Sequence, residues 1–405
     1  MTQKEFRTQS PYPQWEQPIF PFTPNAGFPG YEFTYYRDIY GGYQPIMHNP
    51  FAYNLYSYPH PLPYPNTNST SEVASPSNSE LTYDYSTTEL QRLSETVLPH
   101  TTDEPVSVPL SKQNAILIKK FYDAFIRGDI DSATKFITDD FIMHVPGKGL
   151  NAGEYWGVDG FKKFFSNIMS YGGGKFSMEV PVLAVSGNTA FTREIVKLNR
   201  KFDPERMFEL HFMMQYRMRN GKISEAWTIP EDLYLYDQFW TPPTNKNTPT
   251  SSSRNKQTAS QGPSTKGAVS PKNYQLIRDF YNKFWSGDLE GMKALTSDDF
   301  EFFVPGRSSL AGTYKGWEGY LKFRSELIKL AGDKYKLEID SMSASDSDVF
   351  VREYIRMNRK WDPTLQTVPA VILHFKIRNG KIAKINDIPV DLYAYEKFFT
   401  PPVKA

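Results

Sequence analysis

The fold is decided by the stretch FYDAFIRGDIDSATKFITDDFIMHVPGKGLNAGEYWG, residues 121–157. It returns in altered form as FYNKFWSGDLEGMKALTSDDFEFFVPGRSSLAGTYKG, residues 280–316. Both stretches contain Gly-Asp, Asp-Asp-Phe, Val-Pro-Gly and Ala-Gly in the same order, at a constant offset of 280 − 121 = 159 residues. The agreement continues without a gap through Arg-Glu, Asn-Arg-Lys and Asn-Gly-Lys-Ile, and ends at Thr-Pro-Pro in 241–243 and 400–402. Because chance does not produce a match of this length, the chain is predicted to hold two copies of one domain.

The repeat divides the chain into four parts. Residues 111–243 and 271–405 are the two predicted domains, and residues 244–270 are a linker rich in Ser, Thr and Asn. Residues 1–110 are rich in Tyr, Phe and Pro and poor in Leu, Ile and Val. Such a composition cannot bury enough aliphatic surface to offset the entropy of ordering the chain, so we predict that this segment is disordered.

Composition excludes several classes of function. The 405 residues include 46 Lys and Arg against 45 Asp and Glu, so no net charge favours nucleic acid or an acidic membrane. Cysteine is absent and the six histidines are scattered, so we expect neither a metal site nor a cofactor. The N-terminal residues MTQKEFRTQSPYPQW lack the apolar core of a secretory signal, and no stretch approaches the ~20 apolar residues of a membrane helix. These features predict a cytoplasmic or nuclear location.

Each copy has the pattern of helices followed by strands. Apolar residues at helical spacing predict a first helix, which Gly128 ends: Leu117, Ile118, Phe121, Tyr122 and Phe125. Asp129 is placed to cap a short second helix, and a third is expected over 158–170. Strands are expected over 141–145, 176–185, 189–201, 207–219 and 222–229, with a tight hairpin at Asn220-Gly221. A short helix of the form Asp-Leu-Tyr-x-Tyr-x-x-Phe ends both copies. This order predicts an α+β domain with an antiparallel sheet and helices on one of its faces.

These motifs, together with RMRNGKI in the first copy and KIRNGKI in the second, resemble the SnoaL-like branch of the nuclear-transport-factor-2-like superfamily. The resemblance covers both copies and none of the first 110 residues. It implies two tandem cone-shaped domains, each a curved antiparallel sheet wrapped on helices around an apolar pocket. Because superfamily members often dimerise through the sheet, it also implies an intramolecular pseudo-dimer of the two copies. The fold hosts isomerases, cyclases, hydrolases and binding modules, so the resemblance alone assigns no function.

The catalytic positions of the superfamily's ketosteroid isomerases are not retained. Those enzymes use a tyrosine on the first helix, a base after the first strand and an acid on a later strand. Phe121 and Phe280 align with the tyrosine, and Val145 and Val304 align with the base. The neighbourhood of the acid, 212–216 and 371–375, contains no carboxylate. The resemblance therefore speaks against isomerase chemistry, and we favour a protein without catalytic activity while leaving the question open.

Three polar side chains remain candidates for chemistry. Glu194 and its counterpart Glu353 lie on the apolar face of a predicted strand, where each could be a pocket acid with a raised pKa or a paired structural residue. His144 is a candidate base. The apolar residues of its strand point to the opposite face of the sheet, which is expected to face the core, so a surface or interface histidine is the favoured interpretation. Tyr122 follows the isomerase position directly, and we expect it to point about 100° away around the helix.

Two turns carry candidate binding residues. The motif Asn-Arg-Lys followed by Phe or Trp and then Asp-Pro occupies 199–204 and 358–363. Each motif predicts a basic and aromatic contact patch for an acidic partner, with a plain turn as the alternative. The candidate binding residues are Arg200, Lys201, Phe202, Arg359, Lys360 and Trp361.

The sequence thus favours a non-catalytic binding or scaffold protein. Its paired domains and aromatic segment would contact protein partners, in a nuclear or ribonucleoprotein setting. The alternatives are a small-molecule enzyme of the cyclase, isomerase or hydrolase type and a carrier of a small apolar ligand. No feature indicates a membrane, and none indicates nucleic acid directly.

Overall fold

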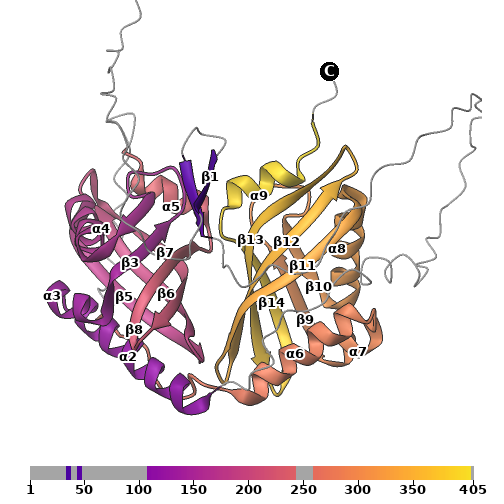
Figure 1. Ribbon diagram of the computed structural model, residues 1–405, viewed down its shortest axis with the longest axis horizontal. Helices are drawn as coiled ribbons and strands as arrows, with labels where there is room; N and C mark the ends of the chain where they lie inside the picture. The colour runs from indigo at the N-terminus through magenta and orange to yellow at the C-terminus, as the bar shows by residue number, and fades with distance from the viewer. Residues whose placement is uncertain (1–32, 38–42, 48–106, 243–258, 403–405) are drawn as a thin grey trace, which may run out of the picture. The chain divides into compact units, whose positions relative to one another are not determined.

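The computed structural model describes residues 33–37, 43–47, 107–242 and 259–402 (Figure 1). Most of the segment predicted to be disordered, and linker residues 243–258, lie outside the described residues. Within that segment, β1 (Phe33–Arg37) and β2 (Tyr43–Met47) form an antiparallel pair that the sequence pattern did not predict. Threonine and tyrosine, which both occur in this pair, favour extended chain.

The N-terminal repeat begins with the helices and continues with a meander of strands. Its elements are α2 (Val108–Ile126), α3 (Ile130–Ala133), η1 (Thr134–Phe136), β3 (Ile137–Val145), β4 (Gly153–Trp156), α4 (Gly157–Tyr171), β5 (Gly172–Ser186), β6 (Thr189–Arg200), β7 (Asp203–Arg219), β8 (Lys222–Pro230) and α5 (Leu233–Trp240). The short strand β4 was not predicted.

The C-terminal repeat has the same elements in the same order, apart from the short 3-10 turn η1. They are α6 (Pro271–Trp285), α7 (Leu289–Ala294), β9 (Thr296–Val304), β10 (Gly312–Lys315), α8 (Gly316–Leu330), β11 (Ala331–Ala344), β12 (Asp348–Arg359), β13 (Asp362–Arg378), β14 (Lys381–Pro389) and α9 (Leu392–Phe399). None of the described helices is long and apolar enough to cross a membrane.

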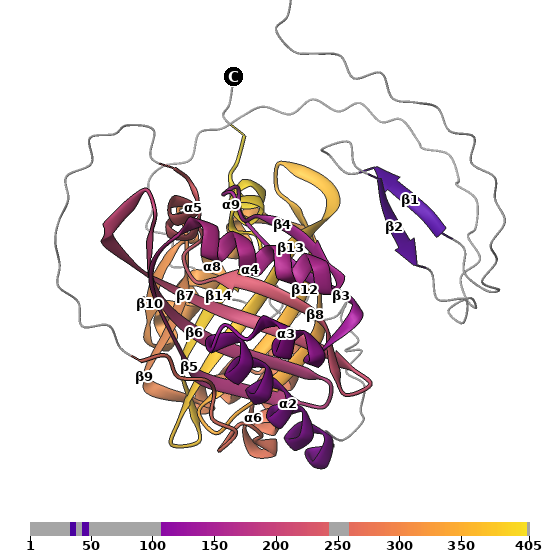
Figure 2. The same cartoon turned by 90° about the vertical axis from the view of Figure 1, so that its left-hand side faces the viewer.

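Both sheets have one strand order, β4-β3-β8-β7-β6-β5 and β10-β9-β14-β13-β12-β11, so the repeats share one fold as predicted. The sheets are mixed rather than purely antiparallel, because β3 pairs with β8, and β9 with β14, in parallel. The physical reason is the crossover: α4 carries the chain to the far edge, and the four-stranded meander then brings β8 back beside β3. Figure 2 shows α2, α3 and α4 on one face of the N-terminal sheet.

Local signals in the sequence explain where elements begin and turn. The carboxylate of Asp129 accepts a hydrogen bond from the backbone N–H of Ser132 at 3.1 Å and caps α3, as predicted. Asn220 and Gly221 have φ of 53° and 72°, the left-handed conformation that a two-residue hairpin requires. The equivalent residues Asn379 and Gly380 repeat this turn at 54° and 74°.

Each repeat has its own core between helices and sheet, and a further cluster of buried side chains includes residues of both repeats. Phe191 and its counterpart Phe350 stack with ring centroids 5.3 Å apart. Around this cluster the Arg352 guanidinium donates to the Gln215 carbonyl at 2.6 Å. The residues in the cluster are Val182, Ala184, Phe191, Met213, Trp227, Ile229, Phe350, Ile372 and Ile388.

The terminal helices α5 and α9 contribute a reciprocal pair of contacts between the repeats. The Tyr234 hydroxyl donates to Glu396, and the equivalent Tyr393 hydroxyl donates to Asp237 at 2.8 Å. Each carboxylate also accepts backbone N–H groups of its own repeat, as Asp237 does from Lys148 at 2.9 Å. The two tyrosine rings meet edge to face at 5.2 Å.

Candidate functional site

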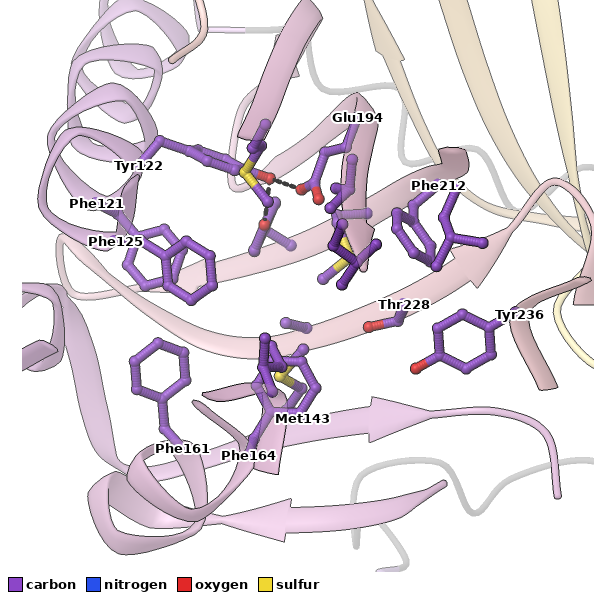
Figure 3. Close-up of a pocket in the computed structure, with 18 of the residues that line it drawn as sticks. Phe121, Tyr122, Phe125, Met143, Phe161, Phe164, Glu194, Phe212, Thr228 and Tyr236 are labelled. Carbon is purple, nitrogen blue, oxygen red and sulfur yellow. Dashed lines mark hydrogen bonds between the residues drawn. The ribbon is translucent and has the colours of Figure 1, made fainter. Parts of the chain in front are cut away.

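The N-terminal repeat encloses a cavity of about 90 Å³ between its helices and its sheet (Figure 3). Apolar side chains make up most of its wall, and α2, α4, α5 and the sheet all contribute. The labelled lining residues are Phe121, Tyr122, Phe125, Met143, Phe161, Phe164, Glu194, Phe212, Thr228 and Tyr236.

One buried polar network crosses this apolar wall. The Tyr122 hydroxyl donates to the Glu194 carboxylate (Figure 3). Its oxygen also lies 2.6 Å from the Tyr216 hydroxyl and 2.8 Å from the Thr192 hydroxyl. Burial raises the pKa of Glu194 to about 7, and the hydrogen bonds from Tyr122 and Thr192 oppose this rise. Tyr122 lines the cavity although it lies one residue, about 100° around the helix, from the isomerase position. The buried face of α2 is wide enough to hold both Phe121 and Tyr122, which are 5 % and 2 % exposed.

The C-terminal repeat has an equivalent cavity of about 120 Å³. The Tyr281 hydroxyl donates to Glu353, as Tyr122 does to Glu194. Burial raises the pKa of Glu353 to about 8, and the nearby Asp387 adds to the rise. At the offset of 159 the other polar members of the network are apolar, since Val351 replaces the threonine and Phe375 replaces the second tyrosine.

Two charged side chains enter the C-terminal cavity where the N-terminal repeat has uncharged ones. Asp387 stands in the place of Thr228, and Arg324 in the place of Phe165. Burial raises the pKa of Asp387 to about 7, and a hydrogen bond with Tyr395 opposes the rise. Among the described residues, Asp387 Oδ1 and Arg324 Nη1 are buried atoms without a hydrogen-bond partner. Two residues that line this largely apolar cavity therefore each contain one buried polar atom without a partner.

Sequence reasoning missed Asp387 and Arg324. Neither residue lies at the isomerase acid position on β7 and β13, and the strand alternation that indicated Glu194 and Glu353 does not indicate them. The signal was nevertheless present, because aligning the repeats at the offset of 159 sets Asp387 against Thr228 and Arg324 against Phe165. A charged residue on the buried face of an element is unusual. Where the other copy has an uncharged residue at the same position, the charge indicates that the two pockets differ in their chemistry.

His144 does not reach either cavity. Its Nδ1 lies 3.1 Å from Glu154 and its Nε2 lies 3.0 Å from Glu225, while its ring stacks on Trp227 with centroids 5.1 Å apart. The strand alternation that turns Met143 inward turns His144 to the other face of the sheet. A base at this position cannot act on a ligand in the pocket.

The two arginines of the predicted contact patches serve their own repeats. Arg200 is 5 % exposed, and its Nη1 donates to the backbone carbonyls of Gln238 at 2.7 Å and Thr241 at 3.0 Å. Arg359 donates to the Phe398 carbonyl at 3.2 Å and to the Asp362 carboxylate at 2.6 Å. Both guanidiniums tie the turn to the terminal helix, so neither is presented to a partner.

The neighbouring residues of these turns lie further out. The Lys201 ammonium lies 5.3 Å from the ring centroid of Phe202, which is 37 % exposed. Trp361 is contacted by its own repeat's arginine, with 5.6 Å between the guanidinium carbon and the ring centroid. A binding role for Lys201, Phe202, Lys360 and Trp361 stays a prediction.

No group of three or more His, Cys, Asp or Glu in the described part of the chain could hold a metal ion. The polar groups of the described residues that line the cavities are carboxyl, phenol, threonine hydroxyl, indole N–H and guanidinium groups. Such groups can donate and accept hydrogen bonds, and the buried carboxyls can exchange a proton near neutral pH.

The chain forms two tandem domains with curled sheets around an apolar pocket. This architecture agrees with the family that the sequence matches. The family model of the SnoaL-like domain matches residues 118–226 and 277–385, together more than half of the chain. The chain therefore belongs to the SnoaL-like domain family, as its motifs indicated.

Individual relatives match one repeat each. The uncharacterized protein Rv0034 of Mycobacterium tuberculosis is 25 % identical over 125 residues, which are 31 % of this chain and 93 % of that protein. The solved structure of Bal32a, from a soil-derived mobile gene cassette, is 22 % identical, with a TM-score of 0.30 and coverage of 32 % of this chain and 98 % of its own. An NTF2-like protein of unknown function from Burkholderia pseudomallei is 20 % identical, with a TM-score of 0.29 and the same coverage. The SnoaL-like fold is shared by ligand-binding and cyclase-like enzymes and by proteins without catalytic activity.

Proposed function

We propose that the C-terminal repeat binds a small, largely apolar ligand that carries one polar group, and that the N-terminal repeat is its structural partner. The observation that supports this is the pair of unsatisfied buried atoms, Asp387 Oδ1 and Arg324 Nη1, on two residues that line a largely apolar cavity. A buried donor or acceptor without a partner costs about 1–3 kcal/mol. A ligand hydroxyl that donates to Asp387 and accepts from Arg324 removes both costs at once.

The size of the cavity limits the ligand. At about 120 Å³ it is somewhat smaller than the roughly 150 Å³ apolar cavity that takes up benzene. A single ring with a small polar substituent therefore fits with slight side-chain movement, and a larger ligand requires that the wall opens. The N-terminal cavity is smaller, and Glu194 there already has hydrogen-bond partners within the repeat.

Two single-ring probes test the proposal on the full chain: 4-fluorophenol and fluorobenzene, followed by ¹⁹F NMR titration. We expect the phenol to bind at least tenfold more tightly, because it supplies the missing donor and acceptor. Asp387→Val and Arg324→Met should each remove this preference. Thr228→Val, the matched change in the N-terminal repeat, should leave it intact. Equal binding of the two probes, or a preference that survives Asp387→Val, would reject the proposed site.

A second candidate function is proton transfer by the same cavity. It is favoured by the raised pKa values of Glu353 and Asp387, about 8 and about 7, which suit a general acid or base at neutral pH. Deuterium exchange at the α-carbon of cyclohexanone provides a test without a known substrate. We expect exchange above the buffer rate that falls at least tenfold in Glu353→Gln and little in Glu194→Gln. If the native chain shows exchange only at the buffer rate, proton transfer is rejected and ligand binding remains the proposed function.

The roles in protein assembly expected from the sequence stay proposals. An intramolecular pseudo-dimer is supported by the reciprocal contacts of Tyr234 and Tyr393 and by the cluster around Phe191 and Phe350. X-ray scattering of the full chain tests it, since independently tumbling repeats would give an extended profile. Scaffolding of protein partners, recruitment by residues 1–110, and a cytoplasmic or nuclear location remain to be tested. A pull-down that compares the full chain with a chain lacking 1–106 addresses the first two.

A further inference from the structure

The linker ends in a segment that lies along the edge of the N-terminal sheet. β5 is the last strand of that sheet, and Gln261 pairs with it in parallel opposite Glu179. The Gln261 N–H donates to the Met178 carbonyl at 2.7 Å, and the Val180 N–H donates to the Gln261 carbonyl at 3.0 Å. The Met178 N–H donates to the Ser260 hydroxyl, also at 3.0 Å. Hydrogen bonds to its backbone and to a serine side chain therefore hold this segment on β5.

The next residues of the same segment contact α2. A Cβ atom added at Gly262 would lie 3.0 Å from the Asp123 carboxylate. The same atom would lie 3.7 Å from the Ile126 side chain and 3.8 Å from Tyr122 Cβ. The backbone at Gly262 thus passes so close to α2 that a larger side chain has little room. Pro263, which follows it, is buried. The segment therefore reaches from β5 to α2.

α2 and β5 are two walls of the N-terminal cavity. Tyr122 and Phe125 point into the cavity from α2 (Figure 3), and Phe176 and Met178 line it from β5. The segment lies beside one lining residue of each wall, since it passes close to Tyr122 and bonds to Met178. It therefore bridges the seam between these two walls.

The residues that follow are anchored more deeply. Ala268 is 1 % exposed and belongs to the N-terminal core. The Val185 N–H donates to the Ala268 carbonyl at 2.8 Å, and the Asp346 N–H donates to the Gly267 carbonyl at 2.8 Å. This end of the linker is therefore held by backbone groups of both repeats.

An exposed turn separates the two ends. Ser264, Thr265 and Lys266 are exposed, and Gly267 has a φ of 72°, which glycine adopts without strain. Of residues 259–263 only Pro263 is buried, so hydrogen bonds rather than buried surface hold most of this part in place. Segments with few buried contacts open locally at a lower cost in free energy than the whole domain.

We propose that residues 259–263 form a flap, hinged at 264–267, that controls access to the N-terminal cavity. When the flap lies on β5 and α2, it closes the seam between them. When it swings out about the hinge, the seam beside Tyr122 and Met178 is uncovered and a small apolar molecule can enter. The cavity of about 90 Å³ suits a very small apolar guest, such as a xenon atom. The flap belongs to the N-terminal repeat and is independent of ligand binding in the C-terminal cavity.

The absence of cysteine allows the flap to be locked in the full chain, because two introduced thiols are then the only ones. Glu179→Cys with Gln261→Cys places these thiols opposite each other on β5 and the flap. Opposite residues of neighbouring strands lie about 4.8 Å apart, within the range that a disulfide spans. The oxidised chain has a locked flap, and the same chain after reduction is the matched control.

Methionine methyl NMR under xenon measures access to each cavity separately. Met143 and Met214 line the N-terminal cavity, and Met357 lines the C-terminal one. We expect exchange of xenon at Met143 and Met214 to be at least tenfold slower in the oxidised chain than in the reduced chain. Exchange at Met357 should be the same in both. Equal rates at Met143 in the two chains, or no xenon at that methyl group in either, would overturn the proposal.

A second readout does not depend on the disulfide. Gln261→Pro replaces the N–H that bonds to Met178 with a ring carbon, so the flap should leave β5. Exchange of the Val180 amide hydrogen, which bonds to the Gln261 carbonyl, should then quicken at least tenfold. Exchange of the Val185 amide hydrogen, which bonds to the anchored Ala268, should stay unchanged. Unaltered exchange at Val180 would show that the flap does not release, and equal acceleration at both amides would show that the linker moves without a hinge; either result overturns the proposal.

Discussion

The two cavities share one fold and one buried tyrosine–glutamate pair but differ in the charge of their unpaired groups. Among the residues that the structure describes, the buried polar atoms without a partner belong to charged side chains in the C-terminal cavity and to the uncharged Thr228 and Trp240 in the N-terminal one. In the N-terminal repeat, Tyr122 lies within hydrogen-bonding distance of three side chains, so Glu194 belongs to a connected network. In the C-terminal repeat, Glu353 keeps only the tyrosine and gains a second buried carboxyl, Asp387, nearby. A buried polar network stabilises a core when its groups are paired and destabilises it when they are not. The predictions below test whether this difference in charge separates the two cavities in stability and in binding.

The largest expected effect is the pH dependence of stability in the C-terminal repeat. The pKa values of Glu353 and Asp387 in the folded protein, about 8 and about 7, lie above their ordinary values. The folded state therefore binds more protons than the unfolded state. The contribution of these two carboxyls to stability is full below about pH 4 and is lost as the pH rises through 7 and 8. We expect the free energy of unfolding to fall by about 2–4 kcal/mol between pH 5 and pH 8.

Urea titrations at these two pH values measure this loss. Glu353→Gln with Asp387→Asn should remove most of it, and Glu194→Gln should remove less. A flat profile in the native chain would mean that both carboxyls reach water.

The second test converts one cavity into the other. Arg324→Phe with Asp387→Thr gives the C-terminal repeat the side chains of the N-terminal one at both positions. Because two buried charged side chains, each with one unpaired polar atom, are replaced by uncharged ones, we expect the free energy of unfolding at pH 7 to rise by about 1–3 kcal/mol. Thermal or urea unfolding provides the measurement, and phenol binding should be lost in the same variant. Destabilisation by the double change would show that these groups are satisfied in the folded protein.

A smaller difference is expected for the two tyrosines. Tyr122→Phe leaves Glu194, Thr192 and Tyr216 without their shared partner and should cost about 2 kcal/mol. Tyr281→Phe removes a partner from Glu353 alone and should cost about 1 kcal/mol. Urea unfolding of the matched pair gives the difference directly. Equal costs would contradict the connected network in the N-terminal repeat.

The smallest effect is expected for His144→Phe, which installs the residue of the second copy, Phe303. The histidine lies outside the cavity between Glu154 and Glu225, in partly exposed contacts of small energetic value. We expect a change within about 0.5 kcal/mol and unaltered binding of 4-fluorophenol. Loss of binding in this variant would connect the outer face of the sheet to the cavity.

How far the sequence predicted this structure depended on the kind of signal. The hairpins at Asn220-Gly221 and Asn379-Gly380, the cap at Asp129 and the repeat itself follow from local chemistry and an exact offset, and all were predicted correctly. The parallel pairing of β3 with β8 is set by a crossover of many residues, which no local pattern encodes. Glu194 and Glu353 were recognised from strand alternation. Asp387 and Arg324 were missed because they come from different elements and meet only in the folded cavity.

The reciprocal tyrosine contacts of α5 and α9 have a consequence for how this protein could diverge. In an assembly of two identical chains every substitution appears twice, so a destabilising buried acid would lower the stability of both halves. Gene duplication within one reading frame removes that constraint, because Asp387 and Arg324 occur once and Thr228 and Phe165 keep their places in the other half. The contacts from Tyr234 to Glu396 and from Tyr393 to Asp237 then allow the N-terminal repeat to stabilise the C-terminal repeat, which contains the buried charged residues.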